Sequence, residues 1–189
     1  MNVRPESAGT DDQKTHMSTN TLKIEDPGTV EVGSLITQLD AYLHSLYPPE
    51  CNHLMPIESL RQPNVTFLVA RVDGQAVGCG AFVKHEAGYA ELKRMFVQPE
   101  CRGLGLGRQI LEQLESLIES QGLNVIRLET GVSQLPAVGL YKQFGYQVRG
   151  PFGEYPDDPL SIFMEKTLGA GSNGDTCRLA NRAGESDRC

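Results

Sequence analysis

The chain has 189 residues, of which 39% are hydrophobic and 22% charged, and its formal net charge is −7. A chain of this length can bury a full hydrophobic core, and we expect one domain flanked by tails. The basic residues form no run, so a nucleic-acid surface is not indicated. An acidic chain suits a cationic or amine partner.

The cysteines and the apolar segments set the expected compartment. No Cys-x-x-Cys pair occurs, and this scattered set argues against a disulfide framework and a zinc site, so no metal is predicted. The first 20 residues are polar, and no run of about 18 apolar residues appears, which argues against secretion and membrane spanning. We therefore expect a cytoplasmic protein in a reducing environment. The cysteines are Cys51, Cys79, Cys101, Cys177 and Cys189.

Composition also sets the domain limits. Residues 1–20 are rich in Ser, Thr, Asp and Asn, and residues 169–189 carry Gly, Ser, Asn, Asp and Arg. Neither segment can bury enough apolar surface to offset the entropy lost on ordering, so both are predicted to be disordered tails. The folded domain is expected to cover residues 21–168.

The first half of the domain predicts a strand, a helix, a short helical turn and three antiparallel strands. Apolar residues recur at helical spacing from Val32 to Leu43, and Pro48 and Pro49 end that helix. Asp73-Gly74 favours a type I′ turn between two strands, because both residues tolerate a positive φ. The predicted elements cover residues 21–25, 30–46, 56–61, 66–72, 75–83 and 89–97.

The second half predicts a helix, a strand, a second helix and two strands. Gly122 is placed to cap the first of these helices in the left-handed conformation. Pro136 suits the first turn of the next helix, in which Ala137, Leu140, Tyr141 and Phe144 are expected to share the buried face. The first helix would bury Ile110, Leu111, Leu114, Leu117 and Ile118, and the strands are predicted at 125–130, 146–149 and 161–167.

A glycine-rich turn between the strand ending at Val97 and the following helix is the most informative segment. Gly103, Gly105 and Gly107 alternate there. Backbone N–H groups at a helix start lack intrahelical acceptors, and the helix dipole adds positive potential, so an anion is stabilised where the chain can approach it closely. Glycine permits that approach because it has no Cβ. The turn therefore predicts a phosphate site.

Several other interpretations compete for this turn. A P-loop needs a lysine directly after a glycine, and none is present. A dinucleotide fingerprint lacks its third glycine, since Arg108 or Ile110 stands at that position, although Glu129 lies at about the distance expected of a ribose-binding acid. A merely flexible surface turn is the simplest alternative, but it would not need three alternating glycines.

Two motifs carry a resemblance to a known family. Arg102, Gly105 and Gly107 satisfy Arg/Gln-x-x-Gly-x-Gly/Ala, and Leu140-Tyr141-Lys142-Gln143-Phe144-Gly145-Tyr146 satisfies Leu-Tyr-x-x-x-Gly-Phe/Tyr. The chain thereby resembles the GNAT superfamily of N-acetyltransferases, and in particular small bacterial-type members of largely unassigned substrate. The resemblance implies an α/β (mixed α+β) fold with a central, mostly antiparallel twisted sheet flanked by helices.

The resemblance also implies acetyl-CoA as the acyl donor. In this family the pantetheine arm pairs with the strand before the glycine turn, and the amides of the turn hold the pyrophosphate. The family often has an Asn at the position of Gln134, where a glutamine can still hydrogen-bond to the cofactor. The implied cofactor-binding residues are Met95, Phe96, Val97, Arg102, Gly103, Leu104, Gly105, Leu106, Gly107, Arg108 and Gln134.

The resemblance assigns catalytic roles as well. Tyr141 is expected to be the general acid that protonates the leaving thiolate, with core packing of its ring as the alternative. An amine is a cation at neutral pH and must lose a proton, for which Glu91 is the first candidate base and Glu129 the second. Each could equally be a solvated strand charge. His85 is expected to be a surface residue at a hairpin end.

The acceptor is predicted to be a small molecule with a primary amine, acetylated by direct transfer. Lys93 and Arg94 would suit an acceptor carboxylate, whereas the acidic loop at residues 151–159 would suit a polyamine. Bulky loops at 47–53 and 151–159 favour a closed pocket over a protein substrate. A protein acetyltransferase and a non-catalytic acyl-CoA-binding regulator remain the alternatives, and a homodimer stays open.

Overall fold

The computed structural model describes residues 19–49 and 53–169. Most of the two predicted tails, and Glu50, Cys51 and Asn52, therefore lie outside the described residues. Two compact units make up the chain: Met1–Phe82 with Lys93–Leu114, and Val83–Leu92 with Glu115–Cys189.

The described strands hydrogen-bond in the order β1-β2-β3-β4-β5-β7-β6. The β1–β2, β5–β7 and β6–β7 pairs are antiparallel, and β4 pairs with β5 in parallel. This confirms the predicted mixed α/β fold with a mostly antiparallel sheet. The elements are β1 (Asn20–Ile24), α1 (Val30–Leu46), α2 (Ile57–Leu60), β2 (Val65–Val72), β3 (Gln75–Lys84), β4 (Ala90–Val97), a 3-10 turn η2 (Pro99–Cys101), α3 (Leu106–Ser120), β5 (Val125–Gly131), α4 (Leu135–Gln143), β6 (Gln147–Arg149) and β7 (Ser161–Thr167).

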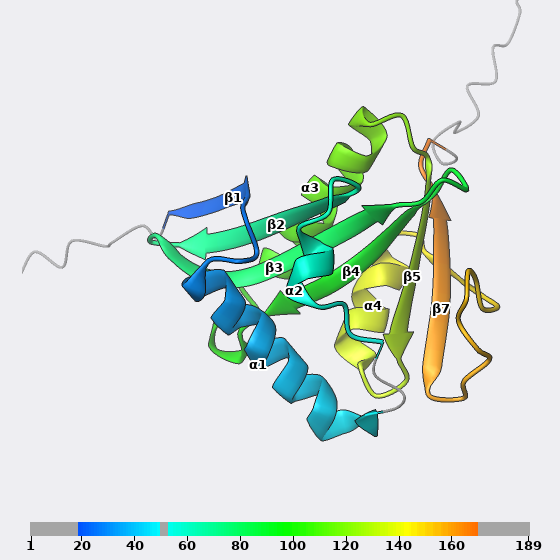
Figure 1. Cartoon of the computed structure of the whole chain (residues 1–189), viewed down its shortest axis with the longest axis horizontal. Coiled ribbons are helices and arrows are strands. Elements are labelled where there is room, and N and C mark those ends of the chain that lie inside the picture. Colours follow the sequence, from blue (N-terminus) through cyan, green and yellow to red (C-terminus); the bar gives the residue numbers. More distant parts are fainter. Residues whose placement is uncertain (1–18, 50–52, 170–189) are drawn as a thin grey trace, which may run out of the picture. The chain divides into compact units, whose positions relative to one another are not determined.

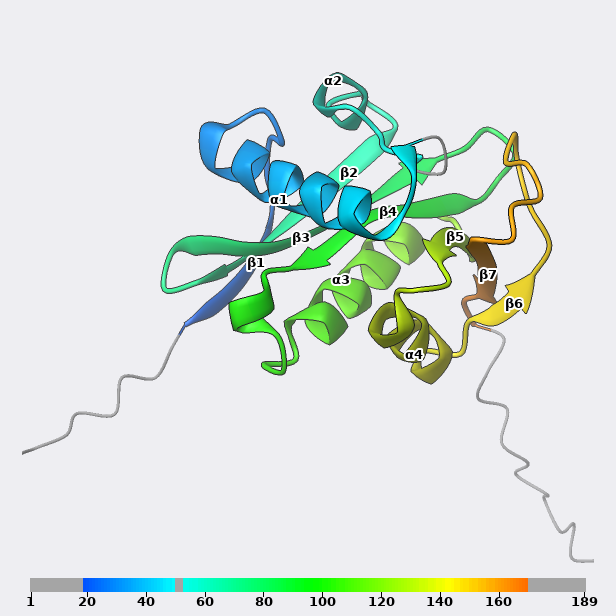
Figure 2. The same ribbon diagram turned by 90° about the horizontal axis from the view of Figure 1, so that it is seen from below.

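In the first unit, α1 lies across β2 and β3 (Figure 1). Its N-cap is Thr29, whose side chain accepts a hydrogen bond from the Val32 N–H and so satisfies one amide at the helix start. Viewed from below, α1 and α2 lie on one side of β2 and β3, and α3 lies on the other (Figure 2). The α1 side buries Val32, Leu35, Ile36 and Leu39 together with Leu60, Phe67, Val69, Cys79, Ala81 and Phe96.

Glycines let the strands of this unit turn and pack closely. Asp73 and Gly74 have φ values of 49° and 85°, which confirms the type I′ turn between β2 and β3. A Cβ on Gly80 would lie 2.7 Å from both the Ile110 Cγ2 and the Met95 Sδ. Because glycine stands there, the first half of α3 can approach β3 directly.

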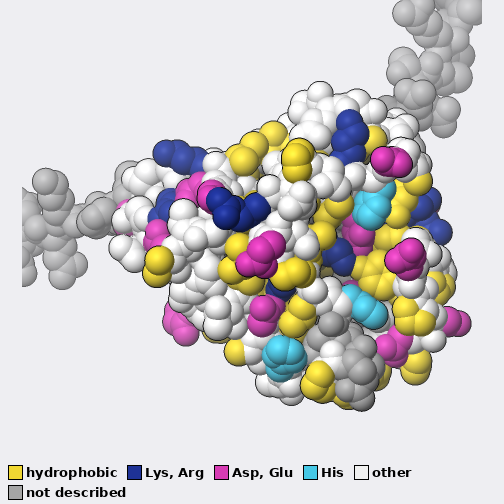
Figure 3. Space-filling view, viewed as in Figure 1, with side chains coloured by type: hydrophobic (Ala, Val, Ile, Leu, Met, Phe, Trp, Pro, Cys, Tyr) yellow, Lys and Arg dark blue, Asp and Glu magenta, His cyan; other side chains and the backbone are white. Residues whose placement is uncertain are grey.

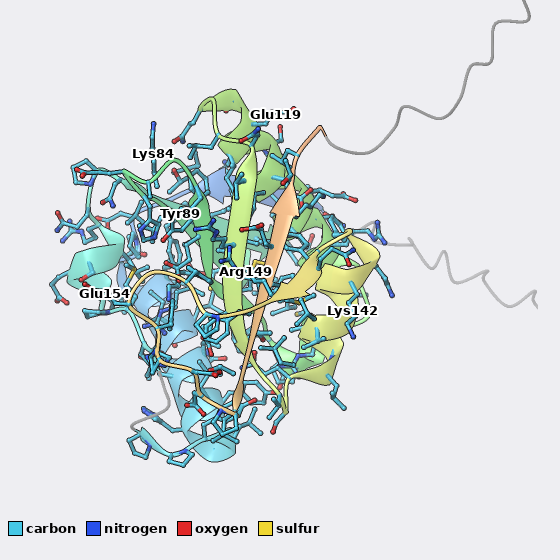
Figure 4. The ribbon with its side chains drawn as sticks, turned by 90° about the vertical axis from the view of Figure 1, so that its right-hand side faces the viewer. Lys84, Tyr89, Glu119, Lys142, Arg149 and Glu154 are labelled. Atoms are coloured by element: carbon cyan, nitrogen blue, oxygen red, sulfur yellow. The ribbon has the colours of Figure 1, made fainter. Side chains whose placement is uncertain are left out.

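In the second unit, β5, β7 and β6 carry α4 on one side and the loop at residues 150–160 on the other. Figure 4 shows this with Lys142 of α4 and Glu154 of the loop on opposite sides of β5 and β7. Gly122 follows α3 with φ 78°, as predicted for a left-handed cap. The predicted buried face of α4 was wrong in part, because Val138 is buried with Tyr141.

Charges of both signs share the molecular surface. On the face shown in Figure 3, Lys and Arg side chains are interspersed with Asp and Glu. A field of one sign, of the kind that steers nucleic acid, does not appear in that view. Among the described helices, none combines the length and apolar character needed to cross a bilayer.

Candidate active site

The glycine turn has the backbone geometry expected of an anion site. Gly103 and Gly105 have φ values of 82° and 75°, and a Cβ on Gly103 would meet no atom within 4 Å. Glycine is therefore required there by backbone conformation and not by crowding. The Gln109 N–H donates to the Gly105 carbonyl at 3.1 Å. The amides of Leu106 and Gly107 therefore precede this hydrogen bond at the start of α3, where backbone N–H groups lack helical acceptors.

Two arginines add positive charge to this turn. The Arg102 Nε donates to the Val97 carbonyl at 3.1 Å, and its guanidinium carbon lies 5.4 Å from the centre of the Tyr42 ring. Arg108 stands in the first turn of α3, which contains no acidic residue. A cation at a helix N-terminus opposes the dipole, so it weakens the isolated helix but strengthens the binding of an anion. These residues fit the pyrophosphate of acetyl-CoA.

The other predicted cofactor residues differ in how far their side chains are exposed. The side chains of Phe96 and Leu106 are 7% and 2% exposed, so both pack in the protein interior and can offer a ligand only their backbone. Leu104 is 58% exposed, at the tip of the turn. Met95 and Val97 on β4 are only partly buried, so their side chains as well as their backbones reach the surface.

Strand β4 contains an irregularity at Arg94, which has a φ of 57°. A non-glycine residue with positive φ is strained and needs support from its surroundings. The Arg94 guanidinium donates to the Asp40 carboxylate and to the Met55 carbonyl, and its side chain is 4% exposed. Arg94 is therefore committed to the protein itself and is not placed to hold an acceptor carboxylate, as one hypothesis from the sequence required.

The pairing of β4 ends just before this irregularity. The parallel register with β5 covers Ala90–Leu92, whereas β4 continues to Val97. The end of β4 that precedes the glycine turn is thus outside the β4–β5 register of the described residues. The sequence carried no sign of this irregularity.

Glu91, the predicted base, is a buried carboxylate in a hydrogen-bonded group of the second unit. It is 4% exposed, and its two oxygens are held by different partners. The Tyr155 hydroxyl donates to Oε1 at 2.6 Å, and the His85 Nε2 lies 2.9 Å from Oε2. Burial, followed by the Glu91 charge, raises the pKa of Tyr155, so the phenol stays protonated and remains the donor.

His85 lies at the end of the β3–β4 hairpin, as expected, and its side chain is 33% exposed, but it also makes specific contacts. Its ring stacks on Tyr89, with centroids 4.5 Å apart and planes 11° apart, and it hydrogen-bonds to Glu91. The Gly88 N–H donates to the His85 carbonyl at 3.0 Å and closes the turn before β4. Sequence spacing could not reveal this arrangement, because it depends on how that turn folds back over the strand.

The loop at residues 150–160 is fastened over the same face by aromatic contacts. Phe152 packs edge-on against Tyr89 at 5.8 Å and against Phe163 at 5.9 Å. The Arg127 guanidinium carbon lies 4.2 Å from the centre of the Tyr89 ring, and its Nε donates to Glu165 at 2.7 Å. In Figure 4, Tyr89 lies on the same side of β5 as Glu154. The loop is therefore held as part of this face.

Tyr141, the predicted general acid, lies on α4 and is 5% exposed. Burial, and then the Glu129 carboxylate, raises its pKa above the ordinary value, so the phenol keeps its proton at neutral pH. Glu129, the second candidate base, accepts a hydrogen bond from the Ser161 hydroxyl at 2.7 Å. Gln134 precedes α4, and its side-chain oxygen accepts from the Thr130 hydroxyl at 2.7 Å.

The cysteines of the described residues bear on a covalent route. Cys79 is fully buried, and burial raises the pKa of its thiol to about 12. A thiol in that state is a poor nucleophile at neutral pH, because only the thiolate reacts. This favours direct transfer over a Cys79 acyl-enzyme.

Comparison with known proteins gives the same family. The sequence model of the Acetyltransferase (GNAT) family matches residues 34–146. A protein of Azospirillum brasilense named IAA acetyltransferase is 50% identical over 149 residues, which cover 78% of this chain and 97% of that protein. The uncharacterized N-acetyltransferase YsnE of Bacillus subtilis is 36% identical over 152 residues, covering 78% and 99% of the two chains.

A solved structure agrees with these relatives. A Klebsiella pneumoniae crystal structure described as an acyl-CoA N-acyltransferase superposes with a TM-score of 0.68 at 39% identity, covering 79% of this chain and 97% of that one. The strand order, the glycine turn and the family match point to one assignment. The chain belongs to the GNAT family and is an acetyl-CoA-dependent N-acetyltransferase.

Proposed function

We propose that the acceptor is a small molecule with a primary amine and that the acetyl group passes to it directly from acetyl-CoA. The observation that carries this proposal is a pair of carboxylates on the face of the second unit that the loop at residues 150–160 covers. Glu91 and Glu129 lie on that face, since Glu91 is in register with Arg127 and Glu129 follows two residues later on β5. Carboxylates attract an ammonium group, and their negative charge favours the transfer of its proton to a base nearby.

The loop at residues 150–160 supports a small acceptor over a protein chain. Phe152 and Tyr155 pack on Phe163, with ring centroids 5.9 Å and 5.5 Å away, so aromatic contacts hold the loop down on β7. A peptide substrate would require an open groove along this face. The similarity to a relative named IAA acetyltransferase supports a small-molecule acceptor too, and IAA is a candidate to test.

The residue roles follow from the chemistry of the transfer. The amides of Gly103 to Gly107, with Arg102 and Arg108, bind the pyrophosphate of acetyl-CoA, while the backbone of Met95 to Val97 holds the pantetheine arm. Tyr141, kept protonated by burial, gives its proton to the departing thiolate. Glu91 supplies the negative charge toward which the acceptor's proton moves, and Gln134 is a further contact for the donor.

The reaction is proposed to take place in the cytoplasm. Cys79 and Cys101 are both free thiols among the described residues, which suits a reducing compartment.

The test is an acceptor screen with the full-length protein. It is mixed with acetyl-CoA and a panel of amino acids, polyamines and arylalkylamines, together with IAA, while the released thiol is followed. Thiol release that depends on one class of amine supports the proposal and names the acceptor, whereas turnover of IAA alone would contradict a primary-amine acceptor. Acetyl-CoA binding without turnover on any member would favour the regulator, and turnover only on peptides or proteins would favour protein acetylation.

A further inference from the structure

We propose that His85 is the catalytic base that takes the proton from the acceptor amine and that Glu91 is the residue that positions it. This inference rests on the proposed function and assigns its unidentified proton acceptor. It reverses the order of the sequence-based hypothesis, in which Glu91 acted directly and His85 did nothing.

The hydrogen bonds of Glu91 explain why this carboxylate does not act directly. One Glu91 oxygen accepts a hydrogen bond from the Tyr155 hydroxyl, and the other faces the His85 Nε2. The Glu91 side chain is only 6% exposed. A base must come within hydrogen-bond reach of the proton that it removes. The His85 side chain, at 33% exposure, is far more accessible than that of Glu91.

The same bonds fix the tautomer of His85. An ionised carboxylate only accepts hydrogen bonds, so the His85 Nε2 must carry the hydrogen when it pairs with Glu91. A neutral imidazole has one protonated nitrogen, which leaves the lone pair on Nδ1. Nδ1 makes no hydrogen bond within the described residues that would occupy this lone pair, so it can accept a proton.

Side chains from three elements surround the His85 ring. Glu91 on β4 lies 2.9 Å from the His85 Nε2 and is opposite in charge to the imidazolium that forms. The Tyr89 ring stacks beneath the imidazole, and Tyr155 from the covering loop donates to Glu91. Arg127 of β5, which also contacts Tyr89, is balanced by Glu165 at 2.7 Å. The group therefore orients the imidazole, with Glu91 on its Nε2 side and Tyr89 against its ring.

The proton balance follows from these roles. The acceptor ammonium gives one proton to the His85 Nδ1, and the free amine forms a bond to the thioester carbonyl carbon. When the C–S bond breaks, the thiolate takes the proton of Tyr141. The new amide nitrogen then loses its second proton, which restores Tyr141 through solvent, and His85 releases its own proton to water. The net products are the acetylamide, CoA thiol and one proton.

The experiment compares four full-length variants on the best acceptor amine from the screen. In His85→Gln the amide can still donate to Glu91 but cannot take a proton. We expect kcat to fall about 100-fold at pH 7, within the range typical of a lost general base. His85→Ala should regain activity when free imidazole is added. In Glu91→Gln, the fold decrease in kcat should exceed the fold change in KM. Glu86→Gln removes an exposed charge from the same turn and should keep the wild-type rate.

The pH profile separates this role from a structural one. As the pH approaches the acceptor's own pKa, the amine arrives already deprotonated, so the deficit of His85→Gln should shrink. Acetyl-CoA affinity should be the same in all variants. A His85→Gln enzyme with wild-type rates, or a deficit that is constant with pH and not rescued by imidazole, would overturn the assignment while leaving the proposed function intact. A wild-type protein that acetylates no amine would overturn both.

Discussion

Arg94 of β4 donates a hydrogen bond to the carboxylate of Asp40 on α1, and it does so from a backbone position with a φ of 57°. The ion pair therefore joins the helix to the strand where the strand departs from regular geometry. Because β4 ends its register with β5 at Leu92, this pair supports the segment that leads to the glycine turn. Removing this ion pair should lower both the free energy of unfolding and the affinity for acetyl-CoA.

The first prediction concerns this ion pair. Asp40→Ala should lower the free energy of unfolding by about 3 kcal/mol, because it leaves the Arg94 charge buried and without its carboxylate. Urea unfolding would measure the change. Glu112→Ala removes an exposed i,i+4 partner of Arg108 and should cost no more than about 0.5 kcal/mol, which makes it a matched control. Equal losses of unfolding free energy in the two variants would show that the Arg94–Asp40 pair contributes no more than an exposed ion pair.

The second prediction concerns the backbone of Arg94. Arg94→Gly and Arg94→Ala both remove the ion pair, but only glycine adopts a φ of 57° without strain. The glycine variant should therefore be the more stable of the two by about 1 kcal/mol. The same urea measurement decides this, and an alanine variant as stable as the glycine variant would mean that the irregularity in β4 relaxes when the arginine is removed.

The third prediction concerns the glycine turn. Gly105→Ala places a side chain at a φ of 75° in the proposed pyrophosphate site, so affinity for acetyl-CoA should fall tenfold or more, as roughly 1.4 kcal/mol of lost binding would give. Gly122→Ala, at a φ of 78° after the other end of the same helix, should cost similar stability and leave affinity unchanged. Isothermal titration calorimetry would compare them. If Gly105→Ala bound as tightly as Gly122→Ala, the turn would not hold the donor.

The fourth prediction concerns Tyr141. Tyr141→Phe keeps the buried ring and removes the proton, so kcat should fall about 100-fold or more while acetyl-CoA affinity is retained. Thiol release and calorimetry on the same samples would separate the two effects. Tyr146→Phe changes a neighbouring buried phenol, whose ring centroid lies 5.7 Å from that of Tyr141, and is the control. A normal rate in Tyr141→Phe would remove this residue from the reaction.

The fifth prediction concerns pH and the anchoring of β1. The Arg71 guanidinium hydrogen-bonds to both oxygens of Glu25 at 2.8 Å and lowers the pKa of that carboxyl below 4.5. A depressed folded-state pKa contributes stability above the unfolded value, and this contribution is lost as pH falls through the folded value. Glu25→Gln should therefore lower the Tm by about 2–4 °C at pH 7, for a pair worth about 1 kcal/mol.

Thermal melts across the acid range check the sign of that effect. The difference between Glu25→Gln and the wild type should shrink as the pH drops below the usual carboxyl range. A difference that stays constant to low pH would indicate lost packing and not a lost charge pair.

The sequence predicted the fold well because the turn residues and the apolar periodicity favour the same elements that the packing of the sheet requires. Two apolar runs, at residues 66–72 and 75–83, separated by Asp73-Gly74, predicted a hairpin, and the structure has it within one residue at each end. The glycine turn was recognised because its requirement is for residue type at fixed spacing. Burial on α4 was harder to predict, because Val138 and Leu140 are both apolar and only contacts with the sheet decide which is buried.

The acceptor face could be predicted only in part. Glu91 was found because the family places a base on its strand, but its partners Tyr155 and His85 lie 64 and 6 residues away and meet through loop and turn geometry. The positive φ at Arg94 has no sequence signature either, since arginine is not a residue type that favours it. Both features depend on long-range packing.

The fate of the acetyl group tests the central claim most directly. Acetyl-CoA labelled in its acetyl carbon is turned over with the best amine of the screen, and the label is located by mass spectrometry and NMR. We predict that the label appears on the acceptor nitrogen in a one-to-one ratio with released CoA thiol, and that none accumulates on the protein. Label retained on the protein during turnover, or thiol release without an acetylated amine, would contradict direct transfer to a small amine.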